Sequence, residues 1–214
     1  MKTLDVRTIG PQGSAVGFAA LNGFVFRLLG GYHPFVYRLT EALGILSFAP
    51  VFGFALLGLC QLLRRRSLKK VDPDILLLGA FYVLVGAVYL IFKYCAVNYR
   101  PVDLGTGPEA SYPSSHTVLA VCVMSTTISQ VRARIQSAAL RKWTVRLCCV
   151  LMVLIVAGRL LSGVHWCIDI VGALLLSATL LSFYRAAAPE SCGDPCAELP
   201  EKKKKNEKEE SAIR

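Results

Sequence analysis

Two long stretches almost free of charged side chains constrain this chain more than any other feature. Residues 41–63 carry a single charge, Glu41 at the first position, and residues 75–92 carry none. A helix rises about 1.5 Å per residue, so roughly 20 residues cross a hydrocarbon core of about 30 Å. The chain is 54% hydrophobic, and these residues gather in such blocks. The sequence therefore predicts an all-α fold, an integral membrane helical bundle.

Three further stretches raise the predicted number of transmembrane helices to five. They are residues 114–131, 143–161 and 166–184, each polar at one end and apolar over the rest. Residues 15–30 are apolar but short and contain Arg27, which favours a helix lying in the membrane interface. The alternative for this segment is a sixth, short crossing.

The basic residues of the loops predict the orientation of the bundle. Residues 64–70 contain five of them and residues 132–142 contain four, and such loops face the cytoplasm. The loop of residues 94–113 has Arg100 as its one basic residue, so it should face the opposite side. The formal net charge of +10 is then a topology signal. Because no basic stripe with interleaved aromatic residues accompanies it, we expect no nucleic acid partner.

These features divide the chain into three predicted parts. Residues 1–37 form an N-terminal segment with an interfacial or short membrane helix, and residues 38–186 form the transmembrane domain. Residues 187–214 form a charged cytoplasmic tail, whose low apolar content predicts disorder. Within this tail, Cys192 and Cys196 are too few to make a zinc site. No feature of the sequence indicates the oligomeric state.

Ionisable residues gather at the ends of the predicted spans, where they are costly unless they face a polar cavity. They form three clusters, KYCAVNYRP (93–101), YPSSHT (112–117) and GRLLSGVHWCID (158–169). The loop charges put all three on the extracytoplasmic side. Taken singly, a cation here could reach lipid headgroups and a serine could cap a helix.

Taken together, the clusters supply what transfer of a phosphoryl group requires. Lys93, Arg100 and Arg159 provide three cations for the negative charge on the equatorial oxygens. The helix expected to begin near Ser114 and Ser115 adds backbone N–H groups that bind anions.

Two histidines and one carboxylate complete the predicted site. His165 and Asp169 are four residues apart and share a helical face, so Asp169 can hold the proton on one ring nitrogen. The other nitrogen is then free to act as a nucleophile. His116 can donate a proton to the leaving oxygen. No carboxylate cluster accompanies these residues, so we expect neither a metal nor another cofactor.

These clusters resemble the motifs of the type 2 phosphatidic acid phosphatase superfamily, integral membrane lipid phosphatases whose site resembles that of the vanadium haloperoxidases. The matching segments are Lys93 to Arg100-Pro101, Pro113 to His116, and Arg159 through His165 to Asp169. The spacing within all three agrees with the family. Two residues depart from it: Ser115 replaces a glycine, and Gly158 replaces a serine that helps to hold phosphate in the family.

The resemblance implies a metal-independent phosphatase that reacts through a phosphohistidine on His165, with His116 as the general acid. Its substrate would be a lipid phosphomonoester or diphosphate, namely phosphatidate, phosphatidylglycerol phosphate or a polyprenyl diphosphate. We expect the plasma membrane as its location, with the site on the extracytoplasmic face. Two alternatives stay open: phosphotransfer to an acceptor other than water, and non-catalytic binding of a phosphorylated lipid, which Gly158 favours.

Overall fold

The computed structural model describes residues 4–105 and 107–188 of the chain. The α-helices of this described part are α1 (Ala19–Leu28), α2 (Pro34–Leu46), α3 (Phe48–Arg65), α4 (Pro73–Tyr94), α5 (Ser115–Arg134), α6 (Ala138–Leu161) and α7 (Cys167–Ala187). Two short 3-10 helices, Pro11–Gly13 and Leu68–Lys70, accompany them, and no strand occurs in the same residues. The prediction of an all-α fold is therefore confirmed. Apart from residues 187 and 188, the predicted tail lies outside the described residues, as do Cys192 and Cys196.

Four helical stretches of the described part are long and apolar enough to cross a membrane. They are Pro34–Arg65, which joins α2 and α3, and then Pro73–Tyr94, Ala138–Leu161 and Cys167–Ala187. These stretches correspond to four of the five predicted crossings. With ten residues, α1 is about 15 Å long and too short to cross, which agrees with an interfacial helix. The divisions at residues 37 and 186 stay predictions.

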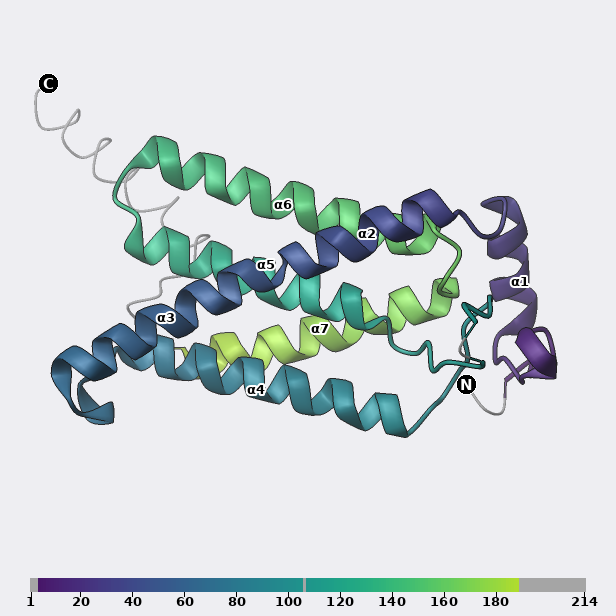
Figure 1. Ribbon diagram of the computed structural model, residues 1–214, viewed down its shortest axis with the longest axis horizontal. Coiled ribbons are helices and arrows are strands. Elements are labelled where there is room, and N and C mark those ends of the chain that lie inside the picture. Colours follow the sequence, from purple (N-terminus) through teal and green to yellow (C-terminus); the bar gives the residue numbers. More distant parts are fainter. Residues whose placement is uncertain (1–3, 106, 189–214) are drawn as a thin grey trace, which may run out of the picture.

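The fifth predicted crossing is α5, which has the length of a span but not the apolar composition of the other four. Figure 1 shows α5 running through the middle of the bundle, and it contacts α2, α3, α4, α6 and α7. Ten of its 20 residues are buried. Because neighbouring helices shield it, α5 can carry polar side chains that bond inside the protein. Thr126 is an example, since its hydroxyl donates to the Cys122 carbonyl at 2.9 Å.

The first membrane stretch begins earlier than the sequence indicated. The predicted crossing starts at residue 41, but α2 already begins at Pro34, a residue suited to the first turn of a helix. The two helices meet at Ser47, close to Pro50, whose missing N–H would have bonded to the Leu46 carbonyl. Glu41 therefore lies within a helix and not at the edge of a span.

A network of ion pairs ties the helices together at the end of the bundle that carries the basic loops. The guanidinium of Arg134, at the end of α5, lies 2.6 Å from Asp74 and 3.2 Å from Asp72 at the start of α4. Arg65, at the end of α3, lies 2.8 Å from Asp72. The three predicted polar clusters lie at the end of α4, the start of α5 and the junction of α6 and α7, which is the opposite end of the bundle (Figure 1).

Candidate active site

The turn between α6 and α7 holds His165, whose side chain is almost fully buried, at 3% exposed. Its Nε2 lies 3.2 Å from Nη2 of Arg159, in the last turn of α6. Because a guanidinium nitrogen can only donate, Nε2 must accept, and the ring proton is then on Nδ1. Nδ1 lies 3.7 Å from Oδ2 of Asp169, in the first turn of α7. The nitrogen that carries the lone pair thus accepts from the cation, and the protonated nitrogen faces the carboxylate.

The environment of His165 favours the neutral ring. Burial, followed by the positive charges of Arg159 and Arg100, holds the pKa of His165 well below its usual range. A neutral imidazole is the form that can attack phosphorus.

Backbone and loop groups position Asp169, which is fully buried. Its Oδ2 accepts a hydrogen bond from the Trp166 backbone N–H at 3.0 Å. Asn98 and Ser111, both buried in the loop between α4 and α5, lie close to the same carboxylate. No local spacing in the sequence links these two residues to Asp169, so neither was among the predicted site residues.

The side chain of Arg159 is completely buried. Its Nη1 donates to Oε1 of Glu41 at 2.7 Å, and its guanidinium carbon lies 5.4 Å from the centre of the Tyr37 ring. Its Nε has no hydrogen-bond partner among the described residues, and neither has Nη1 of Arg100, which is also buried. An anion would supply acceptors for these two nitrogens. The Nε of Arg100 faces a carboxylate already, since it lies 3.1 Å from Oε2 of Glu109.

The remaining predicted residues on α5 lie at its N-terminus. Ser114 is the N-cap and Ser115 the first residue, and the Ser114 side chain makes no capping hydrogen bond to the first-turn N–H groups. Nε2 of His116 lies 3.5 Å from Oε1 of Glu41, and its side chain is 24% exposed. The loop before α5 brings Arg100 to this region, since its N–H bonds to the Glu109 carbonyl at 3.0 Å.

Lys93 lies in the last turn of α4 and is exposed. Among the described residues, its side chain makes no hydrogen bond or ion pair. No contact in the structure links Lys93 to the other predicted residues, so its role stays a prediction from the motif.

The structure gives a physical reason for each departure from the family motifs. A Cβ on Gly158 would lie 2.4 Å from Cγ2 of Thr40, so the close packing of α2 on α6 excludes the usual serine. Ser115 lies in α5 and is not among the residues of positive φ, so a side chain is tolerated there.

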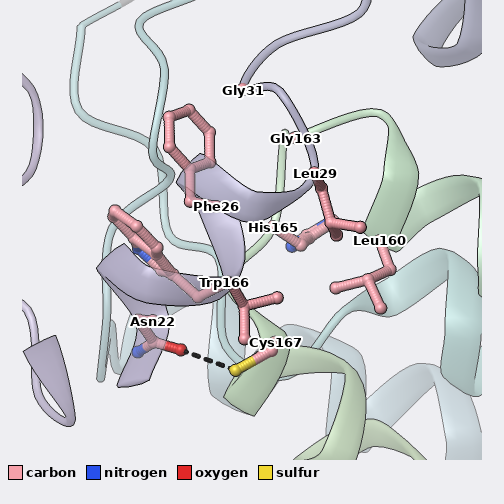
Figure 2. A pocket seen from close by; sticks show the side chains of 10 residues that line it. Asn22, Phe26, Leu29, Gly31, Leu160, Gly163, His165, Trp166 and Cys167 are labelled. Atoms are coloured by element: carbon pink, nitrogen blue, oxygen red, sulfur yellow. Dashed lines mark hydrogen bonds between the residues drawn. The ribbon is translucent and has the colours of Figure 1, made fainter. Parts of the chain in front are cut away.

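The N-terminal segment supports the turn that carries His165. Figure 2 shows α1 lying across this turn, with Asn22 directed at Cys167. Oδ1 of Asn22 accepts from Sγ of Cys167 at 3.2 Å and from the backbone N–H of Ile168 at 3.3 Å. The indole N–H of Trp166 donates to the Tyr99 carbonyl at 2.7 Å. These bonds connect α1, the loop after α4 and the start of α7 around His165.

Comparisons with known proteins agree with this geometry. The pattern of the PAP2 superfamily matches residues 74–191, more than half of the chain. A crystal structure described as the first transmembrane PAP2 type phosphatidylglycerolphosphate phosphatase from Bacillus subtilis is similar in fold, with a TM-score of 0.56. The two sequences are 19% identical, and the match covers 78% of this chain and 84% of that one. No curated protein sequence matches this chain. The family pattern, supported by the shared fold, shows that the chain belongs to the PAP2 superfamily.

Proposed function

We propose that this protein is a membrane lipid phosphatase that works through a phosphohistidine on His165. The observation that carries the proposal is the hydrogen bond of 3.2 Å from Arg159 to Nε2 of His165. Because Nε2 accepts this bond, its lone pair points toward Arg159. In the proposal, the guanidinium of Arg159 binds the phosphate, so the lone pair points toward the group that it would attack.

In the proposed reaction, Arg159, Arg100 and the first-turn N–H groups of α5 bind the phosphate oxygens. Nε2 of His165 attacks phosphorus, the bond from phosphorus to the lipid oxygen breaks, and His116 gives that oxygen its proton. Asp169 stabilises the ring cation formed in this step. His116 then takes a proton from water, which attacks the phosphohistidine and releases inorganic phosphate.

Phosphatidylglycerol phosphate is the first substrate to test, because a protein of similar fold bears that activity in its name. Phosphatidate and a polyprenyl diphosphate complete the panel. We infer an extracytoplasmic site from the loops of residues 64–70 and 132–142, whose basic residues belong to the other end of the bundle.

The test compares phosphate release by the purified wild-type protein with release by His165→Ala, with a chelator present. We expect chelator-resistant release from at least one lipid, and its loss in the variant. His33→Ala is the matched control. The ring of His33, the N-cap of α2, bonds to the carbonyl of Leu29 at the end of α1. The bond from the His33 backbone N–H to the Ser162 carbonyl does not depend on the side chain. If His165→Ala released phosphate as fast as wild type, the proposed mechanism would be wrong.

The same assay separates the two alternatives. Adding an alcohol acceptor and analysing the products would reveal phosphotransfer. The non-catalytic alternative rested on Gly158, for which the contact with Thr40 now supplies a packing reason. Binding of lipid without any turnover by the wild type would still favour it.

A further inference from the structure

A carboxylate that no family motif contains lies within the candidate phosphate site. Glu41 belongs to α2, outside residues 74–191 that match the family. Its Oε1 lies 2.7 Å from Nη1 of Arg159 and 3.5 Å from Nε2 of His116. One carboxylate oxygen is thus shared between the cation and the histidine that the proposed reaction directs at the substrate.

Two glycines allow α2 to bring this carboxylate so close. A Cβ on Gly158 would lie 2.4 Å from Thr40, and a Cβ on Gly44 would lie 2.3 Å from Cδ2 of His116. Gly44 follows Glu41 by three residues and shares its helical face. The replacement of the family's serine by Gly158 and the presence of Glu41 in the site are therefore parts of one arrangement of α2.

The contacts of Glu41 differ from those of a locked structural ion pair. Its side chain is 34% exposed, although its partner Arg159 is completely buried. The carboxylate can therefore turn away without leaving the bundle, whereas Arg159 cannot. Asp169, the other acidic group beside His165, lies on the Nδ1 side of the ring and is fully buried.

We propose that Glu41 is a resident counter-anion that competes with phosphate for Arg159 and His116. In the empty site its carboxylate takes the place of a phosphate oxygen, and an arriving phosphate must displace it. The lipid chains of a substrate contribute binding energy that offsets this competition, whereas inorganic phosphate has no such contribution. Glu41 thereby weakens product binding and favours lipid-linked phosphate over free phosphate. This inference rests on the proposed identity of the site.

The experiment measures the dissociation constant of inorganic phosphate by 31P NMR titration in detergent, which needs no turnover. Glu41→Gln keeps the shape of the side chain but removes its charge, and we expect it to bind phosphate about tenfold more tightly than wild type. Asp74→Asn makes the same charge change at the opposite end of the bundle and should leave the dissociation constant unchanged. Thermal unfolding of each variant identifies loss of the fold.

A purely structural role of Glu41 predicts that the substitution does not tighten phosphate binding. If Glu41 only held Arg159 in place, Glu41→Gln would bind phosphate no more tightly than wild type, and that result would overturn the proposal. Should Glu41→Gln fail to fold, Glu41→Asp replaces it, since its shorter carboxylate withdraws from Nε2 of His116. Tighter phosphate binding is expected again, and unchanged or weaker binding refutes the inference. Turnover by His165→Ala would refute the phosphohistidine while leaving this comparison intact. If neither the wild-type protein nor Glu41→Gln bound phosphate, both proposals would be refuted.

Discussion

Restoring the family's serine at position 158 should destabilise this protein. The added Cβ would lie 2.4 Å from Cγ2 of Thr40, a separation at which α2 or α6 must move. Overpacking of this kind costs about 1–3 kcal/mol of unfolding free energy. In a chain of this size that corresponds to a fall in the melting temperature of roughly 2–12 °C. Gly158→Ser and wild type are to be compared by thermal unfolding in the same detergent.

A double-mutant cycle tests the assigned cause. Thr40→Ser removes the methyl group that clashes but keeps the hydroxyl, which donates to the carbonyls of Val36 and Tyr37. The double variant should regain most of the stability lost by Gly158→Ser, with a coupling energy of about 1–2 kcal/mol. A melting temperature unchanged by Gly158→Ser, or a loss that Thr40→Ser leaves unrelieved, would refute the argument that α2 excludes the serine.

Three further predictions concern other parts of the molecule. The ring of His165 should stay neutral as the pH falls through about 6.5, where an ordinary histidine is half protonated. The folded state then binds fewer protons than the unfolded chain, so the free energy of unfolding should decrease as the pH is lowered beyond about 6.5. Half protonation of the ring near pH 6.5 in 15N NMR spectra would contradict this. Arg134→Ala removes bonds to Asp72 and Asp74 and should cost about 1–2 kcal/mol of stability. The exposed Arg132 is its control, and equal losses for the two variants would argue against the network. With the other cysteines replaced, Cys95, exposed just after α4, should react with an impermeant maleimide added outside intact cells; labelling only after lysis would reverse the orientation.

Part of the candidate site follows from local spacing. His165 and Asp169 are separated by four residues and lie close together, as predicted. They do not share a helical face, however, because His165 lies in the turn before α7 and only Asp169 is in its first turn. Ser114 and Ser115 begin α5 as predicted. Spacing did not reveal Asn98 and Ser111 beside Asp169, since a motif gives the order of residues but not which loop residues pack against them. The catalytic and binding roles of these residues stay predictions.

The hydropathy of α5 likewise does not show whether the helix faces lipid or protein. Residues 114–131 were predicted as a crossing, but the threonines and Gln130 of α5 leave it less apolar than the four long spans. Whether such a helix meets lipid or protein depends on its neighbours. Here α2, α3, α4, α6 and α7 all contact it, so its polar residues are shielded from lipid.

The sequence by itself determined the helical membrane architecture and the residues that match the family motifs. Both are local properties: the length of an apolar run sets a span, and short spacings set which side chains share a turn. Only the tertiary structure decided that Glu41 contacts Arg159, 118 positions away along the chain. That contact depends on the packing of α2 against α5 and α6, which Gly44 and Gly158 allow by having no side chain.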